Sequence, residues 1–300
     1  MNFLASLNRP EYIFNPTQIA RRIACEFGTV GGYSTVSLPW HVAIRVKPHE
    51  SLGSHIRRMG ILDLFTSECI WRLLQPGEVA VDVGANIGHM TSLMAAKSGA
   101  GGRVIAVEPH PEVFEELDFN VRKWKVRGDL APITTCKMAL SDRSGSAKLA
   151  APLSFRQNNG LSFLAPHEAV DPNLQMFKVM TTTLDELLEE ARIGAVSLVK
   201  IDVEGHELQV LEGARQLLRQ KRVRTIVFEE HGTPPTPVTK LLEELGFSIF
   251  LLDGRLSGPV IVPIAEAYNR RGRDAPNYLA TLNPELAVAL MAKKGWSVYA

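Results

Sequence analysis

The stretch of this sequence with the clearest capacity for chemistry is residues 79–88, where an apolar run leads to an acid and two glycines. Asp82 ends the run, Gly84 and Gly88 follow, and residues 89–97 have the composition of a helix. In a strand–turn–helix unit, glycines let the backbone approach a ligand, and the free N–H groups at the helix start face that ligand. The stretch therefore predicts a cradle for a nucleotide-sized ligand.

A second acid narrows the choice of ligand. Glu108 ends the next apolar run and lies 20 residues after Gly88, a spacing at which an acid reaches both hydroxyls of a ribose. The glycine spacing is G-x-x-x-G, and Asn86 stands where a pyrophosphate would need a glycine, so the pattern differs from that of nicotinamide enzymes. A ligand with a ribose and no pyrophosphate fits, and S-adenosylmethionine is such a ligand.

Four motifs together resemble the FkbM family of class I S-adenosylmethionine-dependent methyltransferases: Asp82–Gly88, Ala139–Asp142, Thr183–Asp185 and Lys200–Glu207. The resemblance extends from about residue 77 to residue 281, and the last motif is its most specific part. It implies methyl transfer to a nucleophilic oxygen, or to an amide or amine nitrogen. It also implies that Asp142 contacts the adenine amino group, although a turn before Gly145 explains an aspartate there as well.

The expected fold class is α/β, with a doubly wound, mostly parallel sheet and helices on both faces. The resemblance adds seven strands and an antiparallel final strand. We expect residues 1–76 to form an N-terminal cap beside the substrate and residues 77–300 to form the methyltransferase domain. Residues 150–177 break the rhythm of strands and helices and predict a long irregular insertion over the active site.

Further elements follow from the apolar patterns. Residues 40–46 alternate like a strand, and Ser54 is placed to cap a helix that continues to Leu74. Residues 133–140 predict one strand, and residues 224–230 another. The sequence 270–273 is the only dense basic run, typical of a solvated loop or of a site that steers an acidic substrate.

The strand at 196–203 carries charges at Lys200, Asp202 and Glu204, which share one face. A parallel strand is normally apolar throughout, and an unpaired buried charge is costly, so these residues need partners. They form either a structural ion pair or part of a site at the carboxyl edge of the sheet.

The predicted site has a cofactor part and a catalytic part. The cofactor part consists of Asp82, Gly84, Ala85, Asn86, Gly88, Glu108, Asp142 and Asp202. We expect the glycines to close on the methionine moiety, and Asp82 to orient the turn or to accept from the ammonium group of the cofactor.

The catalytic part consists of His206, Asp202, Glu204 and His231. A neutral imidazole suits proton removal from a hydroxyl, and we favour His206 because it follows the charged strand. The opposing interpretation is that this histidine only packs or caps a helix. Asp202, Glu204, Glu229 and Glu230 are also suited to a hard cation, but we assign no metal because members of the family are not recognised by a metal motif.

The composition is that of an ordinary globular protein, with a net charge of +1 that gives no reason to expect a nucleic-acid partner. Three scattered cysteines and the absence of a signal peptide or spanning segment predict a cytoplasmic enzyme. We expect a small-molecule, glycan or peptide acceptor and a homodimer. The alternatives from other classes are a nicotinamide-dependent oxidoreductase and a non-catalytic binding module with the same fold.

Overall fold

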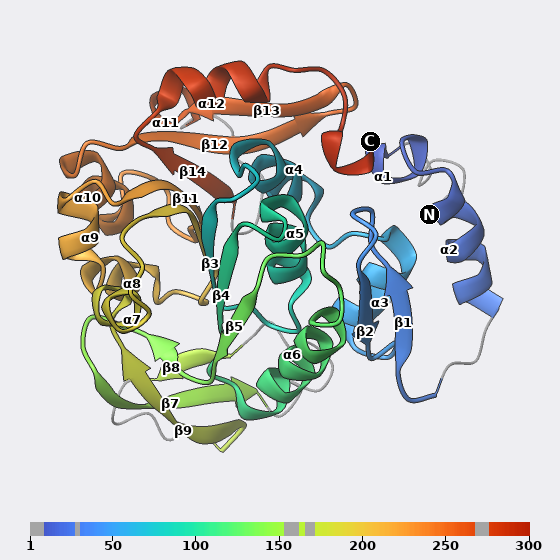
Figure 1. The fold of residues 1–300 in the computed structure, drawn as a ribbon, viewed down its shortest axis with the longest axis horizontal. Helices are drawn as coiled ribbons and strands as arrows, with labels where there is room; N and C mark the ends of the chain where they lie inside the picture. Colours follow the sequence, from blue (N-terminus) through green and yellow to red (C-terminus); the bar gives the residue numbers. More distant parts are fainter. Residues whose placement is uncertain (1–8, 28–30, 153–161, 166–171, 268–275) are drawn as a thin grey trace.

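The computed structural model describes residues 9–27, 31–152, 162–165, 172–267 and 276–300. Its centre is an eight-stranded sheet (Figure 1) with the spatial order β13-β12-β14-β11-β10-β3-β4-β5. The strands, in that order, are Gly258–Pro263, Ser248–Arg255, Asn277–Thr281, Val223–Glu229, Val196–Ile201, Val79–Val83, Arg103–Val107 and Ile133–Cys136.

The strand directions confirm a doubly wound α/β sheet. The neighbours from β11 to β5 are parallel, whereas β14 is antiparallel to both β11 and β12. The predicted number of seven strands was wrong by one, because β13 folds back on β12 as an antiparallel hairpin partner and extends the edge.

Helices cover both faces of the sheet, because the parallel strands are apolar on both sides. Ala80 and Ala106 belong to one buried cluster, whereas Val81 and Ile105 belong to the other. The first cluster includes residues of α4 (Leu64–Leu73), α5 (His89–Ser98), α6 (Pro111–Trp124) and α12 (Pro284–Met291). The second includes residues of α7 (Leu184–Glu190), α8 (Glu207–Glu212), α9 (Arg215–Arg219), α10 (Pro237–Glu244) and α11 (Ile264–Ala267).

The N-terminal segment, which precedes β3, consists of α1 (Pro10–Ile13), α2 (Thr17–Phe27), the hairpin β1 (Ser34–Ser37) and β2 (Ala43–Val46), α3 (Ser51–Met59) and α4. The prediction of one helix from Ser54 to Leu74 was wrong, since Ser54 lies inside α3. The chain turns at Gly60, which has φ 76°, and α4 starts anew. Asp63 caps α4 by accepting the backbone N–H groups of Phe65 and Thr66.

A buried ion pair joins α4 to the C-terminal end of the chain. Glu68 and Arg72 pair on α4 with almost no solvent exposure. The guanidinium of Arg72 donates to the carbonyl oxygens of Lys293 and Gly295, at 2.6 and 2.7 Å. The carboxylate of Glu68 accepts the backbone N–H groups of residues 297 and 298. Both carboxylate oxygens of Glu68 and both terminal nitrogens of Arg72 thus bind residues 293–298 and hold them against α4.

A second, four-stranded sheet has the order β6-β9-β7-β8, with bounds Ala139–Leu140, Leu174–Thr182, Gly145–Pro152 and Phe163–Ala165. Two predictions were wrong here. Residues 133–140 are two strands in two different sheets, and the described ends of the 150–177 insertion belong to strands β7, β8 and β9 instead of an irregular loop. The rest of the insertion and the basic run 270–273 lie outside the described residues.

Candidate functional site

A cavity of about 330 Å³ opens at the carboxyl ends of β3, β4 and β10. This edge of an open α/β sheet is where such folds bind ligands. The glycine turn 84–87 and Glu108 form one wall, and residues 138–140, 149 and 162–164 of the second sheet form another. Residues 200, 202–204 and 206 line it beyond β10, and the N-terminal segment contributes Leu52, Leu62, Asp63 and Thr66.

The glycine turn is specified by close contacts between backbones. Gly84 has φ 73°, and a Cβ built on it would lie 1.9 Å from the carbonyl oxygen of Asp202. Gly88 has φ 97°, and its Cβ would lie 2.9 Å from atoms of Leu117 and Trp124 on α6. Both positions therefore need glycine for conformation and for space, and the predicted cradle has the geometry that its sequence requires.

Substituting Gly84 by Ala is expected to destabilise the fold by about 2–4 kcal/mol, because it combines an unfavourable φ with an overpacked contact. Gly77→Ala is the matched control, since Gly77 has φ 84° but no atom within 4 Å of the added Cβ. Urea unfolding of the two variants measures the difference. Equal losses in the free energy of unfolding of the two variants would show that the contact with Asp202 does not contribute to stability.

Glu108 has both carboxylate oxygens at the turn. Its Oε2 accepts the backbone N–H of Asn86 at 2.9 Å, and its Oε1 accepts that of His110 at 2.8 Å. Burial raises the pKa of Glu108 to about 7, although the two amide hydrogen bonds oppose this shift. The acid is thus held rigidly in the cavity wall, with lone pairs left for a ligand.

Lys200 on β10 contacts carboxylates of its own segment and of the adjacent strand β3. Its Nζ lies 3.1 Å from Asp202 Oδ2 and 3.5 Å from Asp82 Oδ1, and it donates to the carbonyl oxygen of Gly84 at 3.0 Å. Burial alone would lower the pKa of Lys200, but the two carboxylates outweigh it and raise the pKa, so the side chain is an ammonium. The ion pair predicted from the strand is present.

Asp82 is fully buried, accepts the hydroxyl of Thr91 at 2.6 Å, and does not line the cavity. It is the register partner of Lys200 on the neighbouring strand. Lys200 in turn donates to the carbonyl oxygen of Gly84, so Asp82 is connected to the glycine turn through Lys200.

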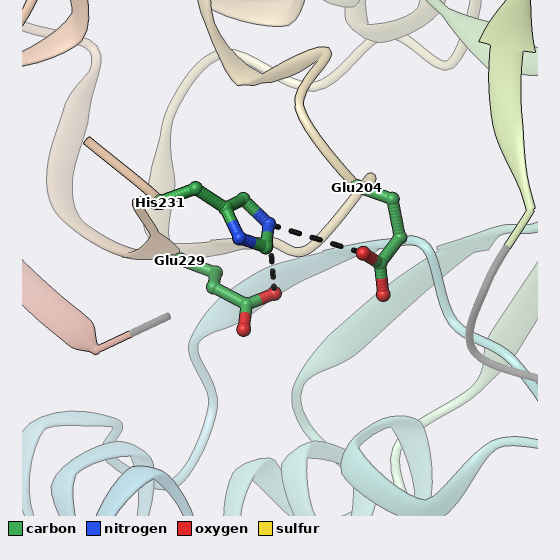
Figure 2. A group of neighbouring side chains, drawn as sticks. All are labelled: Glu204, Glu229 and His231. Atoms are coloured by element: carbon green, nitrogen blue, oxygen red, sulfur yellow. Dashed lines mark ion pairs between the residues drawn. The ribbon is translucent and has the colours of Figure 1, made fainter. Parts of the chain in front are cut away.

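Carboxylates accumulate where β10 and β11 end. Glu204, Glu229 and His231 offer three ligand atoms within 4.8 Å of one another (Figure 2). Burial, followed by the charge of Asp202, raises the pKa of Glu229 to about 8. Of the four acids weighed for a cation, Glu204 and Glu229 belong to this group, whereas Asp202 pairs with Lys200, and Glu230 accepts from Gly232 and Thr236 at the start of α10.

The two candidate histidines lie differently. His206 precedes α8, lines the cavity and makes no capping hydrogen bond, and its Nε2 lies 3.0 Å from Ser141 Oγ. Burial lowers its pKa, although Asp142 opposes this shift. His231 is half exposed and does not line the cavity, and its Nε2 lies 3.8 Å from Glu204. Of the two histidines considered as the base, His206 therefore lies in the cavity wall and His231 lies outside it.

The cavity brings most of the predicted site residues together. It is lined by Gly84, Ala85, Asn86, Glu108, Asp202, Glu204 and His206. Four predicted residues lie outside its wall: Asp82, Gly88, Asp142 and His231. Asp142 is exposed on the loop after β6 and accepts the hydroxyl of Ser141 at 3.1 Å.

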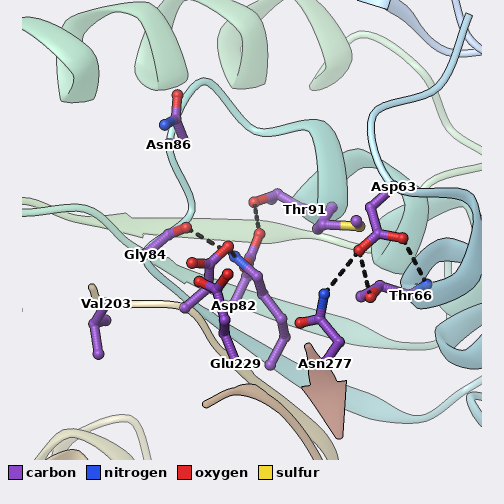
Figure 3. Close-up of polar contacts among 12 residues, drawn as sticks. Asp63, Thr66, Asp82, Gly84, Asn86, Thr91, Val203, Glu229 and Asn277 are labelled. Atoms are coloured by element: carbon purple, nitrogen blue, oxygen red, sulfur yellow. Dashed lines mark hydrogen bonds and ion pairs between the residues drawn. The ribbon is translucent and has the colours of Figure 1, made fainter. Parts of the chain in front are cut away.

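Sequence reasoning missed a polar group at the far end of the cavity (Figure 3). Asn277 on β14 donates to Asp63 Oδ2 at 2.9 Å, and Thr66 donates to the same oxygen at 2.7 Å. The first carboxylate oxygen of Asp63 caps α4. The Asp63–Thr66 spacing is a helix-start signal, but nothing local points to Asn277, which lies 214 residues away.

Comparisons with known proteins agree with this geometry. The family model described as the methyltransferase FkbM domain matches residues 82–249. The hexuronic acid methyltransferase AglP of Haloferax volcanii is 32% identical over 193 residues, covering 63% of this chain and 72% of that protein. The 31-O-demethyl-FK506 methyltransferase FkbM of Streptomyces tacrolimicus is 31% identical over 215 residues, covering 62% and 80%.

Among solved structures, methyltransferase FkbM from Methylobacillus flagellatus superposes with a TM-score of 0.41 and 16% identity, covering 68% of this chain and 43% of that one. The family match covers more than half of the chain and contains the glycine turn, Glu108 and the Lys200–Glu207 motif. The chain belongs to the FkbM family of S-adenosylmethionine-dependent methyltransferases.

Proposed function

We propose that this enzyme methylates a hydroxyl group of a natural product or glycan. The observation that carries the proposal is that one cavity is lined both by the cofactor cradle at Gly84 and Glu108 and by the imidazole of His206. The names of two relatives support an oxygen acceptor: one is a methyltransferase of a hexuronic acid and the other of 31-O-demethyl-FK506. Methylation of a peptide or protein nitrogen is the alternative.

The residues of the wall fit S-adenosylmethionine. Two backbone segments approach so closely at Gly84 that no side chain fits there, and Glu108 offers carboxylate lone pairs to the ribose hydroxyls. Lys200 holds Asp202 against the turn, and Asp202 lines the same wall. When bound, the cofactor supplies an electrophilic methyl group on a sulfonium, and the protein aligns the acceptor for in-line displacement.

His206 is assigned the role of the general base that removes the proton of the acceptor hydroxyl. A burial-lowered pKa keeps its imidazole neutral near pH 7, which a general base requires. Asp202 and Glu204 line the cavity on the same side and orient the acceptor. His231 is the weaker candidate because it stands outside the cavity wall.

Further features of the proposal rest on composition. A net charge of +1 supports an acceptor that is not a nucleic acid, and few, scattered cysteines support a cytoplasmic location. In the described part of the chain, no helix has the length and apolar character to cross a membrane. A homodimer remains part of the proposal.

Mass analysis tests the reaction. The purified chain is incubated with S-adenosylmethionine carrying a deuterated methyl group and with a panel of hydroxylated glycans and polyketides. We expect one acceptor to gain one labelled methyl group, and NMR of the product to place it on oxygen. A label on nitrogen would replace the proposal with its alternative, and absence of transfer to every hydroxyl in an acceptor-rich extract would contradict it.

Glu108→Ala is expected to weaken S-adenosylmethionine binding by about 1.5–3 kcal/mol, the scale of hydrogen bonds to a charged group. Calorimetry measures the affinity. Because Glu108 also accepts two backbone N–H groups, thermal unfolding without cofactor shows whether the variant keeps its fold. Glu112→Ala is the control, an exposed acid in the first turn of α6. Unchanged affinity in an intact Glu108→Ala protein would remove Glu108 from the ribose site.

A further inference from the structure

A chain of hydrogen bonds reaches His206 from outside the cavity. The hydroxyl of Ser141 donates to Asp142 Oδ1 at 3.1 Å, and the oxygen of the same hydroxyl lies 3.0 Å from His206 Nε2. A serine hydroxyl has one proton, and a carboxylate can only accept, so the proton of Ser141 points to Asp142. Ser141 Oγ must then accept from His206, and Nε2 must carry the ring proton of the neutral imidazole.

The other ring nitrogen is therefore the basic one. In a neutral histidine whose Nε2 is protonated, Nδ1 has the free lone pair. Nδ1 of His206 has no hydrogen-bond partner within the described ranges, and the ring lines the cavity. The contact with Ser141 thus selects the tautomer and leaves its accepting nitrogen available.

Ser141 is placed rigidly enough to do this. It is buried, and its backbone N–H donates to Thr182 O at 2.9 Å. Its carbonyl oxygen lies against Gly213 at the end of α8, where a Cβ would approach to 2.0 Å. The backbone of the serine is thus hydrogen-bonded to β9 and packed against the C-terminal end of α8, the helix that His206 precedes.

We propose that Ser141 and Asp142 are positioning residues for the methyl transfer, fixing His206 as the Nε2-protonated tautomer with Nδ1 facing the acceptor. The inference rests on the proposed function, because it gives His206 the role of base. It also gives Asp142 a purpose other than the adenine contact that the family resemblance implies. Similar logic operates wherever a carboxylate sets the tautomer of a catalytic histidine through its second nitrogen.

Nitrogen NMR tests the tautomer without any turnover. The full chain is labelled with ¹⁵N-histidine at pH 8, and the His206 signals are identified as those missing from His206→Gln. We expect a protonated Nε2 and an unprotonated Nδ1 in the wild type, and a mixed tautomer in Ser141→Ala. A protonated Nδ1 in the wild type, or identical signals in the two proteins, would overturn the inference.

Kinetic measurements test whether the contact between Ser141 and His206 contributes to the rate of methyl transfer. Ser141→Ala is expected to lower kcat roughly tenfold, the effect of one lost hydrogen bond, with an unchanged cofactor Kd. Ser141→Thr keeps the hydroxyl and should restore the rate. Ser144→Ala is the matched control, because the hydroxyl of Ser144 donates to Glu186 and its oxygen contacts Thr182 Oγ1, and it does not contact a histidine.

Asp142→Asn separates the two roles of Asp142. A lower kcat with the same S-adenosylmethionine Kd supports positioning. A weaker Kd with the wild-type tautomer of His206 supports the adenine contact and contradicts the proposal. Because the NMR measurement needs no acceptor, failure of the proposed hydroxyl methylation and failure of this inference give different results.

Discussion

His206→Ala is expected to lower kcat by roughly 10²–10⁴ while S-adenosylmethionine binding stays nearly constant, the scale of a lost general base. His206 is in the wall of the cavity. His89 also lines it, but His89 is buried and its Nε2 accepts the backbone N–H of Leu62, whereas His231 is more exposed and stands outside the wall. Single-turnover rates at saturating acceptor measure the chemical step, and calorimetry measures cofactor affinity.

The pH profile gives the same prediction a second test. A base must be unprotonated, so the rate should fall at acid pH, and burial places this fall below the ordinary imidazole pKa of about 6.5. His231→Ala is the matched control and should keep both the rate and the profile. If His206→Ala retains wild-type turnover, the imidazole of His206 only packs beside α8. If His231→Ala abolishes the fall in rate at acid pH, His231 is the general base instead.

Lys200→Met is expected to destabilise the fold by about 3–5 kcal/mol, because it leaves a buried carboxylate without its cation. Asp82 is fully buried on the neighbouring strand, and beyond Lys200 its recorded contact is the hydroxyl of Thr91. The variant also removes the donor to Gly84 O, so the cofactor turn should loosen together with the sheet. Urea unfolding measures the stability, and calorimetry measures the cofactor affinity.

A second substitution tests whether the uncompensated charge of Asp82 causes the loss of stability in Lys200→Met. Asp82→Asn combined with Lys200→Met removes the uncompensated charge and should recover part of the lost stability. Lys148→Met, at an exposed position of β7, should change the stability by less than about 0.5 kcal/mol. A double variant no more stable than Lys200→Met alone would show that Lys200 acts through packing.

The parts of this protein that sequence predicted well are those in which the physical reason is local. An apolar strand, an acid and two glycines specify the turn at Gly84, because close backbone approach excludes every other residue there. The charges at Lys200 and Asp202 had to find partners inside a parallel sheet, and they do. Strands that are apolar on both faces predicted the doubly wound sheet, and helices cover both of those faces.

What sequence did not predict depends on contacts between distant segments. Residues 133–140 divide between two sheets because Ala139 and Leu140 pair with Thr181 and Thr182 instead of extending β5. The tautomer of His206 depends on a serine 65 residues earlier in the chain. Neither partner is marked by spacing or composition, and only the packing of β9 and α8 brings them together.

The ion pair between Glu68 and Arg72 bears on how far this enzyme is modular. α4 lies in the N-terminal segment, yet its charged atoms hold residues 293–298 at the other end of the chain. An exchange of residues 1–76 with those of a relative, made to change acceptor preference, would therefore leave the last turn of the recipient chain without its anchor. A segment exchange that keeps this anchor must therefore move α4 together with residues 293–298.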